Sequence, residues 1–193
     1  MSESSLPPGW QDPAGPPVLS DGVVTLRPPT ADDVPAIVRH CRDPEMVRWT
    51  TVPHPYGEAD AHDFLRHSRD SWADHTGAVW SVADAADDSY CGGIDLRYDG
   101  AGGAEVGYGV AAWARGHGVA RRALALACGW GFEHGGCEVV LWWAFAGNEA
   151  SRRTARAAGF RVLDRTVPLA LPQRGERRDG WLGTLVPSGL VRP

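Results

Sequence analysis

Two glycines one residue apart mark the part of the sequence with the clearest chemistry. They lie in the segment ARGHGVARR, residues 114–122, where an extended pattern gives way to a helical one. Without side chains at positions 116 and 118, backbone N–H groups can approach an anion at the positive end of the helix. Three arginines could add charge-assisted contacts to that anion, namely Arg115, Arg121 and Arg122. The spacing also fits a tight strand-to-helix turn with solvated arginines, so both interpretations stay open.

Two familiar nucleotide-binding loops do not fit this segment. A P-loop needs a Gly-Lys pair, and the chain has no lysine. A dinucleotide-binding fingerprint needs a third glycine or alanine three residues after the second, and that position holds Arg121. The sequence therefore excludes a P-loop and disfavours a dehydrogenase.

Few other residues have the spacing that catalysis or metal binding requires. Glu105, shortly before the glycine loop, could accept a proton if burial raised its pKa, or it could be an ordinary strand carboxylate that faces solvent. The seven histidines show no H-x-x-x-H or H-E-x-x-H spacing, and no G-x-S-x-G motif occurs. We expect neither a metal site nor a serine hydrolase.

The hydrophobic pattern predicts the elements that position these residues. Apolar side chains recur at helical spacing over residues 31–42, 58–74, 119–134 and 149–158. Alternating or β-branched runs predict strands over residues 23–27, 79–83, 93–98, 104–110, 139–144, 161–169 and 181–186. Residues 49–56 are expected to form a loop. The order is that of a mixed α/β fold, antiparallel at first and β-α-β later.

The composition is that of a globular protein with one domain. The 193 residues include 43% hydrophobic residues, and the net charge is -5, which argues against a nucleic-acid partner. No apolar run reaches the roughly 18 residues of a membrane span, and the first residues do not resemble a signal peptide. The four cysteines form no C-x-x-C pair. We therefore expect a cytoplasmic protein with reduced cysteines. Residues 1–17 contain five prolines and are expected to be a flexible leader before the domain at 18–193.

Three ordered blocks resemble the GNAT N-acetyltransferases. Residues 115–120 (RGHGVA) are similar to that family's R/Q-x-x-G-x-G/A loop, and they follow EVGYGV at 105–110. The third block consists of NEAS at 148–151 and AGF at 158–160. WTTVPHPY at 49–56, an acidic helix after it and DGW at 179–181 resemble the RimJ/RimL branch, which acetylates ribosomal proteins. The resemblance covers residues 18–186 and implies a twisted, mixed sheet of six or seven strands with splayed central strands, flanked by about four helices.

The resemblance also implies roles for individual residues. In the family the glycine loop binds the pyrophosphate of acetyl-CoA, here through Arg115, Gly116, His117, Gly118, Val119, Ala120 and Arg121. Backbone N–H groups near Gly109 and Val110 would polarise the thioester carbonyl. Asn148 would contact the pantetheine arm, although it could simply cap the following helix. Where this chain has Ala155, many relatives have a tyrosine that acts as the general acid and protonates the leaving thiolate. The resemblance suggests that Ser151 takes this role here.

The acceptor would be an amine. Trp49, His54 and Tyr56 could form an aromatic and acidic wall for a cationic amine together with helix acids, namely Glu58, Asp60, Asp63, Asp70 and Asp74. Those acids could equally be a solvated helix face. The hypothesis is an acetyl-CoA-dependent N-acetyltransferase, with Glu105 as base, acting on a peptide N-terminus or a small amine. A non-catalytic acyl-CoA-binding module and a nucleotide-dependent oxidoreductase are the alternatives. Either a monomer or a homodimer is compatible with the sequence.

Overall fold

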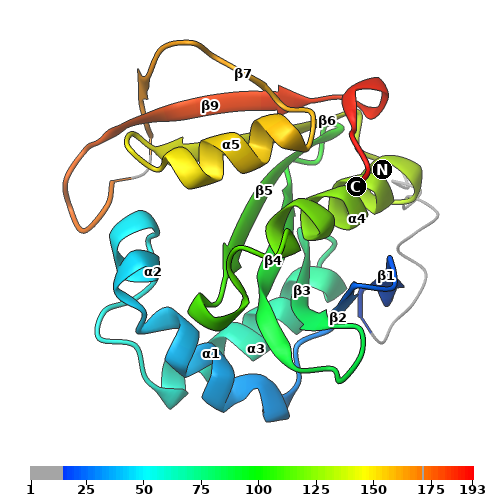
Figure 1. Cartoon of the computed structure of the whole chain (residues 1–193), viewed down its shortest axis with the longest axis vertical. Coiled ribbons are helices and arrows are strands. Elements are labelled where there is room, and N and C mark those ends of the chain that lie inside the picture. Colours follow the sequence, from blue (N-terminus) through cyan, green and yellow to red (C-terminus); the bar gives the residue numbers. More distant parts are fainter. Residues whose placement is uncertain (1–14, 171) are drawn as a thin grey trace, which may run out of the picture.

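The computed structural model describes residues 15–170 and 172–193. Over these residues the chain forms one nine-stranded sheet in the order β1-β2-β3-β4-β5-β6-β9-β7, with β8 also paired to β9 (Figure 1). The strands are β1 (Leu19–Ser20), β2 (Val24–Arg27), β3 (Gly77–Asp84), β4 (Tyr90–Tyr98), β5 (Gly103–Val110), β6 (Val139–Phe145), β7 (Arg161–Val162), β8 (Val167–Pro168) and β9 (Asp179–Leu185). The α-helices are α1 (Val34–Cys41), α2 (Pro44–Trp49), α3 (Glu58–Ala73), α4 (Val119–Glu133) and α5 (Glu149–Ala157).

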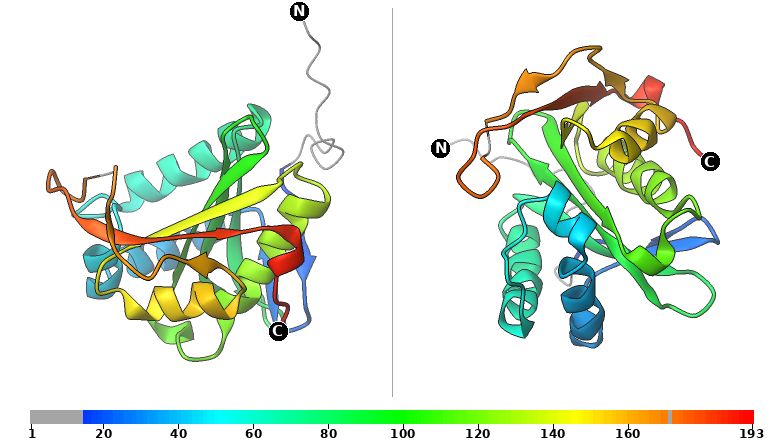
Figure 2. Two further views of the ribbon diagram at one scale, coloured as in Figure 1. Left: turned by 90° about the horizontal axis from the view of Figure 1, so that it is seen from above. Right: turned by 60° about the vertical axis from the view of Figure 1, so that its left-hand side comes forward.

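Helices cover both faces of the sheet. Figure 2 shows α1, α2 and α3 on one side of the sheet and α4 with α5 on the other. We call these sides the α3 face and the α4 face. Because side chains alternate along a strand, β4 directs Leu96 to the α4 face and Asp95 to the α3 face. On the neighbouring strand, Val106 and Tyr108 share the α4 face, whereas Gly107 lies opposite Asp95 on the α3 face.

The centre of the sheet is splayed. β5 and β6 run parallel, as expected for a β-α-β unit whose crossover helix is α4. Their register covers only Gly103–Glu105 against Val139–Leu141. Beyond these residues β5 continues beside β4, and β6 continues beside β9. The predicted α/β fold with separated central strands is therefore confirmed.

Tryptophans dominate the main core. The ring of Trp80 on β3 meets that of Trp130 on α4 edge-on, with centroids 5.4 Å apart, and Trp72 lies 5.9 Å from the same ring. Trp80 is fully buried, and its Nε1 donates a hydrogen bond to the carbonyl of Pro17 at 2.9 Å. A smaller apolar cluster joins α1 to α3 through Ile37 and Leu65. The main core holds α4 against the sheet and reaches α3 through Trp72, whereas the smaller cluster joins α3 to α1.

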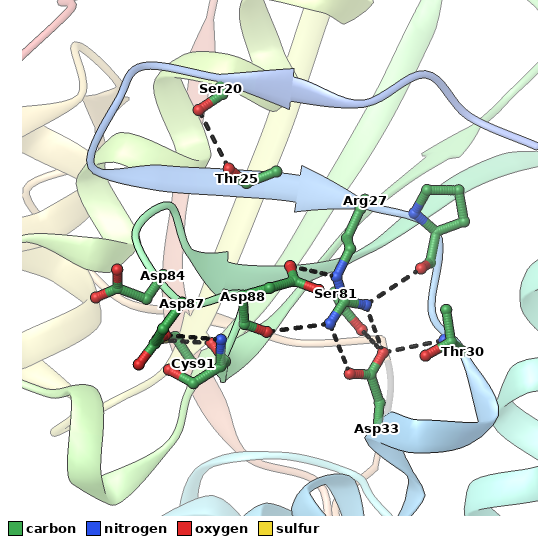
Figure 3. Close-up of polar contacts among 12 residues, drawn as sticks. Ser20, Thr25, Arg27, Thr30, Asp33, Ser81, Asp84, Asp87, Asp88 and Cys91 are labelled. Carbon is green, nitrogen blue, oxygen red and sulfur yellow. Dashed lines mark hydrogen bonds and ion pairs between the residues drawn. The ribbon is translucent and has the colours of Figure 1, made fainter.

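A buried ion pair fixes the beginning of α1 to the sheet (Figure 3). Arg27, at the end of β2, donates two hydrogen bonds to the carboxylate of Asp33 at 2.8 and 2.9 Å. Asp33 also accepts from the N–H of Thr30 and from the hydroxyl of Ser81 on β3. The side chain of Asp33 is only 4% exposed, so these contacts replace the water that its charge would otherwise bind.

Some local predictions were wrong. The sequence pattern predicts no helix between residues 42 and 58, yet α2 begins at Pro44, because the Asp43 side chain accepts from the N–H groups of Glu45 and Met46. Aspartate at the N-cap with proline in the first turn is a helix start signal. The expected strand at 161–169 is two separate pieces, β7 and β8. Three of the nine strands have only two residues, which explains the difference from the expected six or seven.

The expected leader lies mostly outside the described residues. Residues 1–14 are among those that the structure does not describe, whereas residues 15–17 reach the sheet through the contact of Pro17 with Trp80. None of the helices in the described ranges combines the length and the apolar character needed to cross a membrane.

Candidate active site

A cavity of about 720 Å³ passes through the sheet where β5 and β6 separate. On the α3 face it is lined by side chains of α1, α2 and α3, including His40, Met46 and Phe64. On the α4 face it is lined by the glycine loop and by the first turns of α4 and α5. The cavity therefore connects the two faces, and two different ligands could meet in it.

The glycine loop has the geometry of an anion site. Gly116 (φ +84°) and Gly118 (φ +75°) adopt the left-handed conformation that favours glycine. A Cβ at either position would meet no atom within 4 Å, so the backbone conformation, rather than crowding, requires glycine. α4 begins at Val119, and the N–H of Arg122 bonds back to the carbonyl of Gly118 at 3.1 Å. The backbone N–H groups that precede Arg122 point out of the N-terminal end of α4, where a bound anion is stabilised.

The three arginines of this segment have different partners. Arg115 donates to Asp43 at 3.0 Å and to the carbonyl of Val110, and Arg122 pairs with Asp21 at 2.7 Å. Arg121 lines the cavity, and its buried Nε has no hydrogen-bond partner among the described residues. An orphaned buried donor beside open helix N–H groups fits a phosphate. His117 is exposed and lies outside the cavity lining, so its predicted cofactor contact stays a prediction.

Replacing Arg121 by Ala should weaken coenzyme A binding by about tenfold or more, because a charge-assisted hydrogen bond contributes roughly 1.5–3 kcal/mol. The matched control is Arg122→Ala, which removes a neighbouring arginine that is paired with Asp21. Isothermal titration of both variants with coenzyme A would measure the difference. Equal loss in the two variants would contradict a specific role for Arg121.

Side chains on the α3 face lie close to the backbone at Gly109. A Cβ at Gly109 would come 3.0 Å from Met46 Cε and 3.2 Å from His40 Cε1. The predicted oxyanion contacts of Gly109 and Val110 stay predictions, and both residues line the cavity. The nearby Gly92 (φ +159°) sits where the β3–β4 register shifts, and a Cβ there would lie 2.2 Å from the Gly109 carbonyl oxygen. Glycines thus allow strands to come close at this point.

Hydroxyl groups gather on the α4 face of the cavity. The hydroxyl oxygen of Tyr108 lies 2.8 Å from Ser151 Oγ, in the first turn of α5. Asn148 caps this helix, because its Oδ1 accepts from the N–H of Ser151 at 3.1 Å. Burial raises the pKa of Tyr108 to about 12, so its hydroxyl keeps its proton at neutral pH. The pair can donate a proton to a group bound in the cavity. Tyr108 was missed in the sequence, and its place inside the EVGYGV block was the available signal.

Two carboxylates lie on the α3 face near the splay. Glu105 accepts hydrogen bonds from Arg97 at 2.6 Å and from Trp143 Nε1 at 2.7 Å, and it is not among the residues that line the cavity. Asp95, on the neighbouring strand, does line the cavity and is paired with Arg97. Burial raises the pKa of Asp95 to about 6. Nothing in the sequence pattern distinguished Asp95 from an ordinary strand residue.

The aromatic residues expected to bind the acceptor are separated. Trp49 and Tyr56 line the cavity, whereas His54 is exposed and outside the lining. Trp49 closes one side from the end of α2, and Gln173 fixes this end by donating to the carbonyls of Arg48 and Thr50 at 2.8 and 2.9 Å. None of the predicted acids is in the lining either: Glu58, Asp63, Asp70 and Asp74 are exposed, which favours the solvated-face interpretation, and the half-buried Asp60 accepts from the N–H of Gly57 at the start of α3. Glu45 and Asp95 supply the acidic side chains of the lining instead.

His40 is a further titratable group buried in the wall. It is 2% exposed, and its Nδ1 lies 3.1 Å from the hydroxyl of Tyr90. Burial, with the charge of Arg115, lowers the pKa of His40 to about 4, so the ring is neutral at physiological pH. The described part of the chain has no group of three or more His, Cys, Asp or Glu side chains placed to hold a metal ion.

Comparison with known proteins agrees with this geometry. Residues 24–161 match the family model of the acetyltransferase (GNAT) domain. The match spans more than half of the chain, which therefore belongs to the GNAT acetyltransferase family. It is an N-acetyltransferase, and the cosubstrate of this family is acetyl-CoA. A comparison with curated proteins gives no significant match.

Several solved structures share the fold. Mycobacterium smegmatis RimJ in complex with CoA-disulfide is 22% identical with a TM-score of 0.78, covering 95% of this chain and 91% of that one. The ribosomal-protein-S5-alanine acetyltransferase from Vibrio fischeri is 15% identical with a TM-score of 0.76, covering 91% and 99%. The microcin C7 self-immunity acetyltransferase MccE, in complex with acetyl-CoA and AMP, is 17% identical with a TM-score of 0.76, covering 86% and 93%.

Proposed function

We propose that the protein transfers the acetyl group of acetyl-CoA to a primary amine by direct attack of the amine on the thioester carbonyl. The observation that supports this best is the continuous cavity between β5 and β6. Its lining includes an acidic residue, Asp95, on the α3 face and two hydroxyl groups, those of Tyr108 and Ser151, on the α4 face. The amine and the thioester can therefore approach from opposite faces of the sheet.

The proposed cofactor contacts lie on the α4 face. The N–H groups at the start of α4, together with Arg121, would hold the pyrophosphate. Asn148 would lie beside the pantetheine arm, and the backbone at Gly109 and Val110 would polarise the carbonyl oxygen. In this proposal Ser151 protonates the leaving sulfur, Tyr108 returns a proton to Ser151 across their 2.8 Å contact, and water returns a proton to Tyr108.

The proposed acceptor contacts lie on the α3 face. Trp49 and Tyr56 offer aromatic surface, and Glu45 offers a negative charge to a cationic amine. A carboxylate on this face would take the proton of the amine; Glu105 is the candidate from the sequence and Asp95 the candidate from the cavity lining. Two of the similar structures are named as ribosomal-protein or RimJ acetyltransferases, which favours a protein N-terminus as acceptor over a small amine.

The test is the release of free thiol from acetyl-CoA. We expect release with a pool of peptides that carry free N-termini and little release with small cationic amines or without acceptor. Mass spectrometry should find the acetyl group on the peptide amine. Release with small amines alone would contradict the peptide assignment but not the transferase. No release with any of these acceptors, while acetyl-CoA at about a hundred times its Kd stabilises the fold by roughly 2.7 kcal/mol, would favour the acyl-CoA-binding module or an acceptor outside these pools.

A further inference from the structure

Two carboxylates on the α3 face share one arginine, and of the two only Asp95 is among the residues that line the cavity. Arg97 Nη2 donates to Glu105 Oε1 at 2.6 Å, and Arg97 Nη1 donates to Asp95 Oδ2. The same Glu105 oxygen accepts from Trp143 Nε1 at 2.7 Å. Glu105 thus already has two donors and is not in the lining, whereas Asp95 is part of it.

The strand next to Asp95 leaves room for its carboxylate. The residue paired with it across the β4–β5 ladder is Gly107, and a Cβ there would come 2.7 Å from Asp95 Oδ1. A side chain at position 107 would therefore cover the oxygen that Arg97 Nη1 does not contact. Both residues line the cavity, and the Asp95 side chain is 25% exposed. The Asp95–Arg97 pair thus lies over Gly107 in the cavity wall, since a Cβ at position 107 would also come 2.9 Å from Arg97 Nη1.

We propose that Asp95 accepts the proton of the acceptor amine and that Glu105 is a positioning residue that holds Arg97 against it. This assignment rests on the proposed function. The neutral amine attacks the carbonyl carbon with its lone pair, and as the nitrogen–carbon bond forms the nitrogen gives one proton to the Asp95 carboxylate. The carbon–sulfur bond then breaks, its electron pair leaves on the sulfur of coenzyme A, and the sulfur takes a proton from the Ser151 and Tyr108 hydroxyl pair, which water restores. The proton on Asp95 returns to water, so the enzyme is restored.

The charges around Asp95 agree with this role. Burial raises its pKa to about 6, the like charge of Glu105 acts in the same direction, and Arg97 on β4 opposes them. His67, on α3 above the strand, also favours the ionised form. A carboxylate of this kind is ionised at pH 7–8 yet more basic than an ordinary aspartate, as a general base should be.

The experiment compares Asp95→Asn with Glu105→Gln in the full chain. Thiol release with the best acceptor gives kcat/KM from about pH 5 to pH 9. Titration with coenzyme A checks that each variant still binds the cofactor, and circular dichroism checks folding. The exposed Asp32 provides a control with the same change of charge, Asp32→Asn.

We expect Asp95→Asn to lower kcat/KM by about 100-fold or more with unchanged coenzyme A affinity. Glu105→Gln should keep most of the activity at pH 8. The acidic limb of its kcat/KM profile should move to lower pH, because the substitution removes a like charge near Asp95. Asp32→Asn should behave as the wild type. Activity that survives in Asp95→Asn but is lost in Glu105→Gln would contradict the assignment of Asp95 as the base and leave the proposed acetyl transfer intact. A wild type that is inactive with every acceptor would contradict both the assignment and the proposed function.

Discussion

Replacing Asp33 by Asn should lower the free energy of unfolding by about 3 kcal/mol, because breaking one partner of a buried pair leaves an uncompensated charge. The guanidinium of Arg27 is only 16% exposed and would lose its carboxylate at 2.8 Å. Thr30 and Ser81 would lose a charged acceptor. Urea unfolding at pH 7 measures the loss directly.

The matched control for this prediction is Asp88→Asn. Asp88 pairs with the same arginine, but its side chain is 66% exposed, so the expected loss is below about 1 kcal/mol. A loss in Asp33→Asn no larger than that in Asp88→Asn would contradict a structural role for the buried pair (Figure 3).

The contribution of Asp33 should also depend on pH. Burial acts to raise its pKa, but the hydrogen bonds from Arg27, Thr30 and Ser81 outweigh burial and lower it. A lowered pKa in the folded state contributes stability above the unfolded value of about 3.9 and loses it as the pH falls through the folded value. The difference between wild type and Asp33→Asn should therefore shrink below about pH 4.

Gly159→Ala is the second substitution with a large expected effect. Gly159 ends α5 at φ +103°, and the N–H groups of Gly159 and Phe160 bond back to the carbonyls of Arg156 and Ala155. A Cβ at Gly159 would lie 1.9 Å from the carbonyl oxygen of Gly189, so the C-terminal segment would have to move. Backbone strain and displacement together should lower stability by about 3–5 kcal/mol.

Gly100→Ala separates the two causes of this loss. Gly100 also has a positive φ, +74°, but a Cβ there would meet no atom within 4 Å. Backbone strain alone should lower its stability by about 1–2 kcal/mol. Thermal unfolding of the two variants would measure the difference, and equal shifts in Tm would mean that the contact with Gly189 is easily relieved.

Features that depend on a few neighbouring residues could be predicted from the sequence. Gly116 and Gly118 mark the glycine loop because a positive φ and a helix N-terminus are local requirements. The alternating and helical periods of apolar residues predicted the main strands and helices, because these periods also depend only on neighbouring residues. The α2 helix was missed although its signal is local, namely an aspartate at the N-cap followed by a proline in the first turn.

Sites made by residues far apart in the chain could not be predicted. The contact of Tyr108 with Ser151 spans 43 positions and exists because β5 separates from β6 beside the first turn of α5. Asp95 reaches the cavity because the strand register places Gly107 opposite it. In the sequence, nothing distinguishes either residue from other strand residues. Gln173 meets the end of α2 across more than 120 positions.

The sequence by itself determined the class of protein, through the glycine loop and the blocks that follow one another in GNAT order. Only the tertiary structure decided which carboxylate and which hydroxyl groups line the cavity. The physical reason is that residue type and local spacing set backbone conformation, whereas access to a ligand depends on strand register, burial and partners. These arise only when segments distant in the chain pack together.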